Sequence, residues 1–396
     1  MGRTRVLIVD DSAFMRHSLG RLLSETPSIE VVGAASNGVE GLQMAAALHP
    51  DVITLDVEMP VLDGLGMVKR LMLETPTRVV MLSSLTTRDA RVTLDALEYG
   101  AIDFVPKPSR SLAVDVGRIG EELVRKIDAV AQMPEAAFLR HCRIAAANVM
   151  STVAPRPTAR PDASSSGEKD DAGNARTPVA RSGRLEASTQ VLPPDRPPQA
   201  GARIPAHRLV VIASSTGGPT ALHTLVRGLP ARLGAAVVIV QHMPAGFTTS
   251  LAARLDSSGA LRCAEATSRD VLVEDEILVA PGNEHMLSTT GGRVRLSHLP
   301  PVNGVRPAAD VTLQSVAPIW RDRLLCVVLT GMGSDAREGA RAVKQHGGSV
   351  IAQDADTATI YGMPAAVAEA GLTDEILPLG KIAPWISAWC AAESQS

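Results

Sequence analysis

The feature that most constrains the fold is a break in hydrophobic patterning between residues 151 and 203. Nine prolines lie between positions 155 and 205, among Ser, Arg, Asp and Gly, with no sustained apolar period. Such a segment buries too little apolar surface to offset the cost of ordering it, which predicts a flexible linker. Its charges nearly balance, which favours a plain tether over a nucleic-acid-binding arm. We therefore expect two separately folded domains in this chain of 396 residues.

Before the break, short aliphatic runs alternate with stretches whose apolar residues recur at helical spacing. Five of these runs are expected to be buried strands: RVLIV (5–9), IEVVGAA (29–35), DVITL (51–55), RVVML (78–82) and AIDFV (101–105). This alternation predicts a parallel, doubly wound sheet. A further helical segment is expected at roughly 116–148.

A second alternating series runs from residue 208 to residue 392. Its expected strands are RLVVIA, AAVVIVQ, DEILVAPG, MLSTT with VRLS, LLCVVLT, GSVIAQD and EILPLG. They predict another mainly parallel sheet, with one antiparallel hairpin turned at Gly291–Gly292. The expected fold class is α/β: two doubly wound, mainly parallel-sheet domains, one flavodoxin-like and one Rossmann-like with three layers. We expect a first domain at 1–130, a helical extension and linker at 131–205, and a second domain at 206–394.

Composition excludes several classes of function. Aromatic residues make up 2% of the chain, so the cores must be aliphatic and aromatic platforms for single-stranded nucleic acid are not expected. The net charge of −3 argues further against a nucleic-acid partner. The four cysteines form no C-x-x-C pair, which is typical of reduced thiols in a cytosol. With neither a signal peptide nor an apolar run of membrane-spanning length, the protein is expected to be cytoplasmic and not membrane-inserted.

Five polar residues end the expected strands of the first domain. Asp10 and Asp11 follow the first strand, Asp56 the third, Ser83 the fourth and Lys107 the fifth. Ligands of open α/β sheets gather at the carboxyl ends of strands. Three carboxylates there would repel one another unless a hard cation such as Mg²⁺ held them. A bound cation, a central carboxylate, a hydroxyl and an ammonium together suit phosphoryl transfer to Asp56. Taken singly, each residue is better explained as an ordinary loop cap, and only their combination favours the phosphoryl-transfer site.

Four segments resemble the receiver domain of bacterial two-component response regulators: RVLIVDDSAFMR, DVITLDVEMPVLDGL, MLSSLT and DFVPKPS. The resemblance implies a Mg²⁺ site formed by Asp10, Asp11, Asp56 and the carbonyl of Glu58. It also makes Asp56 the phosphoacceptor, Ser83 the switch hydroxyl and Lys107 the partner of the phosphate. A histidine kinase is the implied phosphodonor.

In the second domain, the stretch LVVIASSTGGPTAL (209–222) places Ser215 between a strand and a helix. Free N–H groups and the helix dipole favour an anion there, which suits a bound phosphate and an oxyanion equally. The turn contains neither G-x-G-x-x-G nor G-K-[ST]. Gln241 and His242 also stand where a dinucleotide fold would carry an acidic residue, which disfavours a phosphate site.

A serine nucleophile needs a base and a group that orients the base. His242 ends the next expected strand, and Asp335 follows the strand LLCVVLT in the turn TGMGSDA. Ser215, His242 and Asp335 are therefore expected on one rim of the sheet, as a Ser–His–Asp site requires. Two glycines flank Met332, whose N–H is a candidate oxyanion donor. Taken singly, helix caps for Ser215 and Asp335 and a strand-end role for His242 remain open, and other histidines compete as base.

Six segments resemble the catalytic domain of chemotaxis protein-glutamate methylesterases, the CheB family: SSTGGPTAL, QHMPAGFTTSLAARL, ILVAPGNEHM, RPAADVTLQSVA, LTGMGSDAREGA and AQDADTATIYGMPAAV. The resemblance implies that Ser215, His242 and Asp335 are catalytic and that Thr216 and Met332 line the site. Small departures from the family pattern occur at Ala213, Ser214, Val305, Ala308, Ser334 and Ala336.

Together the resemblances imply a phosphorylation-activated serine hydrolase. It would demethylate glutamate methyl esters, and deamidate glutamines, on methyl-accepting chemotaxis receptors during sensory adaptation, with no cofactor in the esterase domain. We expect the receiver to pack over the triad and phosphorylation to shift the population towards an open form. The alternative is a catalytically weak, phosphorylation-dependent binding module of a chemosensory array. A transcriptional regulator would need a helix-turn-helix, where residues 208–396 predict a sheet.

Overall fold

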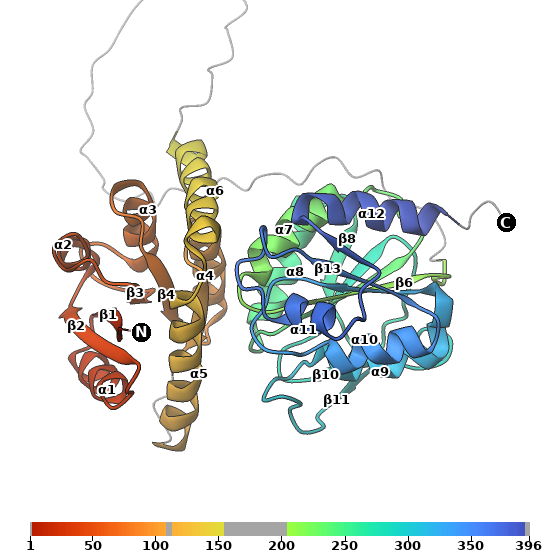
Figure 1. The fold of residues 1–396 in the computed structure, drawn as a ribbon, viewed down its shortest axis with the longest axis horizontal. Coiled ribbons are helices and arrows are strands. Elements are labelled where there is room, and N and C mark those ends of the chain that lie inside the picture. The colour runs from red at the N-terminus through yellow and green to blue at the C-terminus, as the bar shows by residue number, and fades with distance from the viewer. Residues whose placement is uncertain (1, 108–112, 154–203, 393–396) are drawn as a thin grey trace, which may run out of the picture.

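The computed structural model describes residues 2–107, 113–153 and 204–392, so most of the expected linker lies outside the described residues. The structure contains two α/β domains, as the sequence predicts, and they lie side by side (Figure 1). Among the described residues, no helix combines the length and the apolar character needed to cross a bilayer.

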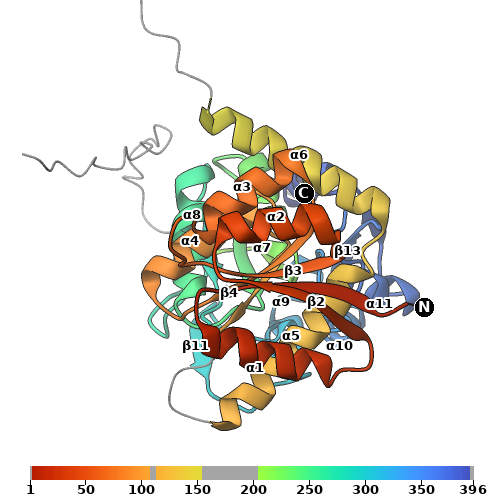
Figure 2. The same ribbon diagram turned by 90° about the vertical axis from the view of Figure 1, so that its left-hand side faces the viewer.

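The N-terminal domain is a five-stranded parallel sheet in the order β2-β1-β3-β4-β5. Its strands are β1 (Thr4–Val9), β2 (Ile29–Ala35), β3 (Val52–Asp56), β4 (Arg78–Ser83) and β5 (Asp103–Pro106). The helices are α1 (Ala13–Ser24), α2 (Gly38–Leu48), α3 (Gly64–Glu74), α4 (Thr87–Glu98), α5 (Ala113–Ala131) and α6 (Glu135–Val153). Helices α2 and α3 cover one face of the sheet and α1 and α5 the other (Figure 2). The order reverses between β1 and β3, which brings the ends of these two strands together.

Local side-chain caps explain where the helices of this domain begin. The N-cap residues Ser12, Asn37, Asp63 and Thr86 each accept a hydrogen bond from an N–H of the first turn of α1, α2, α3 and α4, respectively. The strands between these helices are aliphatic, and every residue of β3 is buried. Asp56, the last residue of the buried central strand β3, therefore lies at the edge of the sheet where β1 also ends.

The expected helix at roughly 116–148 is two helices, α5 and α6, separated at Pro134. Proline disfavours the helical conformation in the preceding residue and lacks an N–H, so one helix ends and another begins there. Helix α6 packs against the first domain: His141 Nε2 lies 2.9 Å from the carbonyl oxygen of Gly100, and Asn148 Nδ2 donates to the carbonyl of Glu98 at 2.9 Å.

The C-terminal domain is a seven-stranded sheet, parallel at every pairing, in the order β14-β13-β12-β6-β7-β9-β8. Its strands are β6 (Leu209–Ser214), β7 (Ala236–Gln241), β8 (Arg262–Glu265), β9 (Glu276–Val279), β12 (Leu324–Val328), β13 (Ser349–Gln353) and β14 (Glu375–Leu377). The helices are α7 (Gly218–Gly228), α8 (Phe247–Ser258), α9 (Ala309–Trp320), α10 (Arg337–Gln345), α11 (Met363–Glu369) and α12 (Leu379–Ala391), with a short 3-10 turn at Arg321–Arg323.

Two features of this domain differ from the sequence-based expectation. The edge strand β8 was not expected, because RCAE is short and carries only one fully buried side chain. The antiparallel hairpin of β10 (His285–Ser288) and β11 (Val294–Ser297) turns where expected, but it forms a two-stranded sheet of its own.

The strand order of the C-terminal sheet positions its candidate site. The chain runs outwards from β6 through β7 in one direction and from β12 through β13 in the other. The order therefore reverses between β6 and β12, and ligands of open α/β sheets bind beyond the carboxyl ends at such a point. The loops after β6, β7 and β12 meet there.

Candidate functional site

Strand register brings Ser215 next to His242. Ser214 pairs with Gln241 at the ends of β6 and β7, and the N–H of His242 donates to the carbonyl of Ser214 at 3.1 Å. Ser215 and His242 are thus the next residues on two adjacent strands. Within the described residues, no hydrogen bond joins the Ser215 hydroxyl to the His242 ring, a separation that is common in enzymes without bound substrate.

Asp335 contacts the ring of His242. His242 Nε2 is 2.7 Å from Asp335 Oδ2, which leaves Nδ1 as the second ring nitrogen. The N–H groups of Ala309 and Asp310, at the start of α9, donate to the same carboxylate at 2.6 and 2.9 Å. Although burial opposes ionisation, the bonds to His242 and to these two amides hold the pKa of Asp335 below its ordinary value. Asp335 is therefore a buried, charged acceptor for the ring.

The backbone around Ser215 is held by the loop that follows β12. The N–H of Ser215 donates to the carbonyl of Thr330 at 3.0 Å. A Cβ atom at Gly331 would lie 2.8 Å from Ser215 Cβ, so only glycine allows the two loops to approach this closely. Gly331 thus serves the packing of these two loops against each other rather than the access of a ligand.

Thr216 and Met332, the predicted lining residues, lie in the same two loops. In the described part of the chain, neither the N–H of Thr216 nor that of Met332 has a recorded hydrogen-bond acceptor. The side-chain hydroxyl of Thr216 already donates a hydrogen bond to the carboxylate of Asp103 in the N-terminal domain. Two backbone donors are thus present in the loops that carry Ser215 and Asp335.

Gln241 is a site residue whose role the sequence did not reveal. Its Nε2 donates to the carbonyls of Ser215 at 3.0 Å and His242 at 3.2 Å, and its Oε1 accepts from the Ser214 hydroxyl at 2.7 Å. The side chain is 2% exposed. A buried amide at the end of an aliphatic strand must be hydrogen-bonded, and this is the signal that points to Gln241.

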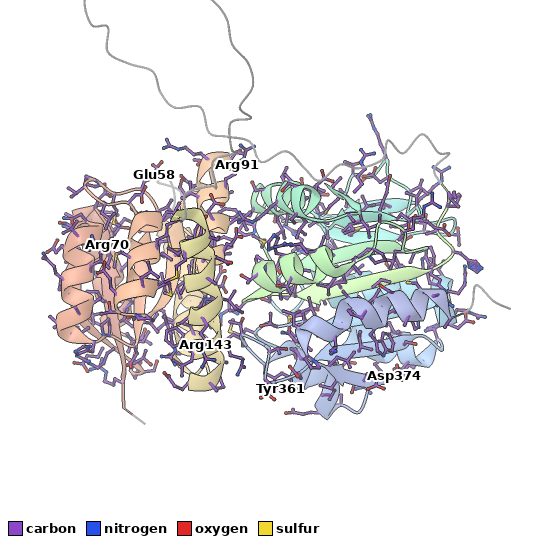
Figure 3. The ribbon with its side chains drawn as sticks, turned by 90° about the horizontal axis from the view of Figure 1, so that it is seen from above. Glu58, Arg70, Arg91, Arg143, Tyr361 and Asp374 are labelled. Atoms are coloured by element: carbon purple, nitrogen blue, oxygen red, sulfur yellow. The ribbon has the colours of Figure 1, made fainter. Side chains whose placement is uncertain are left out.

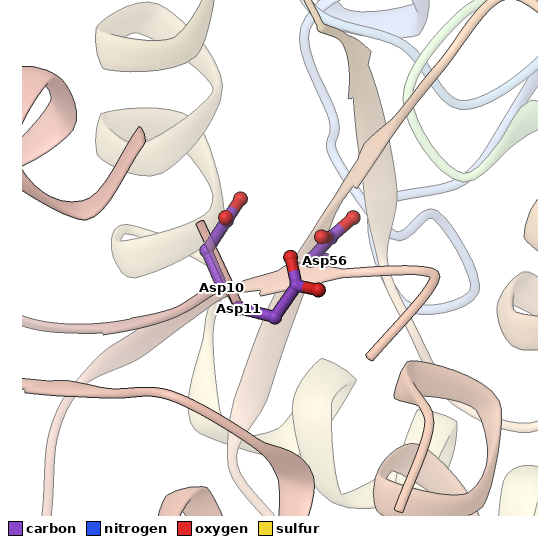
Figure 4. Close-up of side chains that lie close together, drawn as sticks. All are labelled: Asp10, Asp11 and Asp56. Carbon is purple, nitrogen blue, oxygen red and sulfur yellow. The ribbon is translucent and has the colours of Figure 1, made fainter. Parts of the chain in front are cut away.

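The N-terminal domain holds a second group of functional side chains, at the ends of β1 and β3. Asp10, Asp11 and Asp56 each offer a carboxylate oxygen, and these oxygens all lie within 4.8 Å of one another (Figure 4). Lys107 Nζ lies 2.8 Å from Asp10 Oδ2 and 2.7 Å from Asp56 Oδ2. Burial raises the pKa of Asp56 to about 6, and the attraction of Lys107 only partly opposes this.

Two of the predicted residues have side-chain partners outside this cluster. The buried hydroxyl of Ser83 accepts from Thr93 Oγ1 at 2.8 Å and donates to the carbonyl of Ser84 at 3.2 Å. The side chain of Glu58 is exposed on the N-terminal domain (Figure 3), and its nearest cation is Arg88 at 3.7 Å. Their predicted roles as switch hydroxyl and carbonyl ligand stay predictions.

The two groups of residues are linked by a contact between the domains. Thr216 binds Asp103 at the start of β5, and Phe104 stacks on Phe247 with ring centroids 4.4 Å apart. Arg254 of α8 pairs with Asp95, at 2.6 Å, and with Glu98 of α4. The face made by α4 and β5 therefore covers the residue that follows Ser215.

Comparison with known proteins identifies both halves. A family model described as response regulator receiver domain matches residues 6–114, and one described as CheB methylesterase matches residues 210–386. A protein-glutamate methylesterase/protein-glutamine glutaminase of Symbiobacterium thermophilum is 44% identical over 383 residues, which cover 97% of this chain and 96% of that protein. This chain belongs to the protein-glutamate methylesterase/protein-glutamine glutaminase family. The family and the fold class predicted from the sequence are thereby confirmed.

One further relative aligns over almost the whole chain, and two solved structures each align with one part of it. The protein of the same name from Geobacillus kaustophilus is 40% identical, with 97% of each chain covered. A solved CheB methylesterase catalytic domain of Thermotoga maritima is 43% identical over 46% of this chain and 97% of its own, with a TM-score of 0.44. The response regulator domain of Thermotoga maritima CheB is 44% identical over 33% of this chain and 98% of its own, with a TM-score of 0.32.

The acidic cluster of this methylesterase-family chain fits a hard divalent cation. All of its ligand atoms are carboxylate oxygens, the donors that Mg²⁺ prefers. Three carboxylates against the single ammonium of Lys107 leave an excess of negative charge, which a divalent cation would neutralise. The donor set and the charge therefore agree with the receiver assignment.

Proposed function

We propose that this chain is a phosphorylation-activated serine hydrolase that removes methyl groups from glutamate methyl esters on chemotaxis receptors. The observation that carries the proposal is the 2.7 Å contact between His242 and Asp335 beside Ser215, at the switch point of a methylesterase-family sheet. The same site is proposed to deamidate receptor glutamines, because an amide passes through a similar tetrahedral intermediate.

In the proposed mechanism, Ser215 Oγ attacks the ester carbonyl while His242 Nδ1, the ring nitrogen not bonded to Asp335, takes the serine proton. The new Oγ–C bond forms as the carbonyl electrons move onto oxygen. The N–H groups of Thr216 and Met332 are the proposed donors to that oxyanion. Charged Asp335 stabilises the imidazolium that forms.

The intermediate then collapses and the acyl-enzyme is hydrolysed. The C–OCH₃ bond breaks, the imidazolium of His242 gives its proton to the departing methoxide, and methanol leaves. Water attacks the acyl-enzyme as His242 accepts its proton, and the Oγ of Ser215 leaves with that proton. The products are a glutamate carboxylate, or for a glutamine substrate a glutamate and ammonia.

We further propose that Asp56 accepts a phosphoryl group from a chemotaxis histidine kinase. Asp10, Asp11 and Asp56, with the carbonyl of Glu58, would hold Mg²⁺, which when bound neutralises charge on the incoming phosphoryl group. Lys107, already within 2.7 Å of Asp56, would pair with the phosphate, and Ser83 would leave Thr93 to bind it.

Regulation is proposed to act through the contact between α4, β5 and the methylesterase domain. The contact of Asp103 with Thr216 and the Arg254 ion pairs favour a closed form, and phosphorylation would shift the population towards an open one. The proposed units are a receiver at 1–130, an extension and linker at 131–205 and a methylesterase domain at 206–394. We place the protein in the cytoplasm, where the kinase and the receptor glutamates are accessible.

The proposal is tested by methanol release from methylated receptor, with and without a small acyl phosphate as phosphodonor. Wild type is expected to release methanol and to be stimulated by the phosphodonor. Ser215→Ala should be inactive, whereas Asp56→Asn should keep basal activity and lose stimulation. Equal release by Ser215→Ala and wild type would instead support a phosphorylation-dependent binding module without esterase activity.

A further inference from the structure

A buried carboxylate next to Asp335 has no part in the steps above. Asp310, the second residue of α9, is 4% exposed. Its own N–H donates to Asp335 Oδ1 at 2.9 Å, while its Oδ1 accepts from the N–H of Gly339 in the first turn of α10 at 2.7 Å. Buried carboxylates are retained only where they are well bonded, so this pair of contacts needs an explanation.

The contacts form a reciprocal cap between two helices. The N-cap of α9 is Ala308, which has no side-chain oxygen, and the carboxylate of Asp335 accepts from the first two N–H groups of that helix instead. The N-cap of α10 is Ala336, also without an oxygen, and the carboxylate of Asp310 accepts from Gly339 in its place. Each helix start is thus capped by an acid held at the start of the other.

This arrangement links the start of α10 to the position of Asp335, which lies two residues before that helix. The helices pack closely here, since a Cβ atom at Gly339 would lie 2.6 Å from the side chain of Leu313. If α10 shifted, the chain segment that carries Asp335 would shift with it. A displacement of about 1 Å is enough to lower a rate by about 100-fold.

Among the described residues, the charges of two acids act on Asp310: Asp335 in the loop before α10 and exposed Glu338 on α10. The thiol of Cys326 on β12 is in turn influenced by Asp310. Burial, reinforced by the charges of Asp335 and Glu338 and opposed by the Gly339 amide, raises the pKa of Asp310 above its ordinary value. A neutral Asp310 can still accept from Gly339, so its role depends on its oxygen and not on its charge.

We propose that Asp310 is a positioning residue for the hydrolytic reaction, which by accepting the Gly339 N–H holds the start of α10, and with it Asp335, against His242. The inference rests on the proposed function, which assigns His242 and Asp335 their roles. Asp310 itself touches neither His242 nor Ser215 in the described structure.

Three variants of the full chain separate geometry from charge. Asp310→Ala removes the oxygen that binds Gly339. Asp310→Asn removes the charge and keeps one oxygen of the same reach for Gly339, while an NH₂ group replaces the oxygen that accepts from Asn303 Nδ2 at 3.4 Å. Glu338→Ala is the matched control, because Glu338 is an acid in the same turn of α10 as Gly339 and, among the described residues, bonds only Arg337 and Arg341. Should Asp310→Ala fail to fold, Asp310→Ser, whose hydroxyl is too short to reach the same N–H, replaces it.

The measurements are kcat and KM for methanol release with phosphodonor present, thermal unfolding, and the proton resonance of the His242 ring N–H bonded to Asp335. We expect Asp310→Ala to lower kcat by roughly 10- to 100-fold with KM nearly unchanged, and to weaken or shift the ring resonance. Asp310→Asn and Glu338→Ala should stay within about 3-fold of wild type and keep the resonance.

Three results would overturn the inference. They are a folded Asp310→Ala protein with wild-type kcat and ring resonance, an equal loss in Glu338→Ala, and a folded Asp310→Asn protein as slow as Asp310→Ala. Failure of the proposed function is distinguishable, because wild type would then release no methanol and Ser215→Ala would match it.

Discussion

The hydroxyl of Thr216, one residue after Ser215, donates a hydrogen bond to Asp103 of the receiver domain. Asp103 is also paired with Lys126, whose Nζ lies 3.1 Å from Oδ1 and donates to the carbonyl of Phe104 at 2.6 Å. A charged acceptor anchored in the receiver is thus bound to the loop that carries the proposed nucleophile. This contact joins the receiver domain directly to the loop of the proposed hydrolytic site.

Asp103→Asn should raise basal methanol release. The substitution keeps the side chain's shape but replaces a charge-assisted bond to Thr216 with a neutral one, a loss of about 1 kcal/mol and so roughly 5-fold in the closed population. Activity with phosphodonor should not change. An unaltered ratio of stimulated to basal activity would show that this contact does not hold the domains closed.

Arg254→Glu should also raise basal activity, because it places a third acid against Asp95 and Glu98 of α4. A partly exposed pair contributes about 1 kcal/mol or less, so an increase of up to about 5-fold is expected. The double variant Arg254→Glu with Glu98→Arg should return towards wild type in the same methanol assay. If the double variant were as active as Arg254→Glu alone, the ion pair would have no part in the closed form.

Gln241→Leu should lower kcat by more than about 10-fold, because the carbonyls of Ser215 and His242 lose their common donor. Ser214→Ala is the matched control: it removes only the bond to Gln241 Oε1, and its kcat should stay within about 3-fold of wild type. Both are measured by methanol release with phosphodonor. Wild-type kcat in Gln241→Leu would mean that the sheet alone holds the two residues in place.

The packing of α6 on the N-terminal domain should lose stability in mild acid because of His141. Burial lowers the pKa of His141 below its ordinary value of 6.5, so the folded state binds fewer protons than the unfolded state. The contribution of neutral His141 to the free energy of unfolding is fully present above pH 6.5. It is lost as the pH falls from 6.5 towards the lower pKa that His141 has in the folded state.

Thermal unfolding of wild type across this range should therefore show a falling Tm. In His141→Gln the slope should be smaller, while the exposed His17→Gln control should keep the wild-type slope. An identical slope in all three proteins would assign the acid sensitivity to other groups.

The sequence predicted where the candidate functional residues stand along the chain. Aliphatic runs and the residues that end them are local signals, so Asp10, Asp56, Ser215 and His242 could each be assigned to the end of a strand. Strand β8 could not be predicted in this way, because its four residues are too few to show an alternation of apolar and polar side chains. The split of the long helix at Pro134 was missed because apolar spacing continues across it.

By itself, then, the sequence determined two parallel sheets and the rim on which each set of residues lies, because these follow from patterns between near neighbours. Only the tertiary structure decided that Nε2 of His242 faces Asp335, that Gln241 binds two site carbonyls, and that Asp103 reaches Thr216. These contacts depend on side-chain direction and on segments up to 113 positions apart, as for Thr216 and Asp103. No local pattern encodes such a contact, because it exists only once both sheets have formed and the domains have packed together.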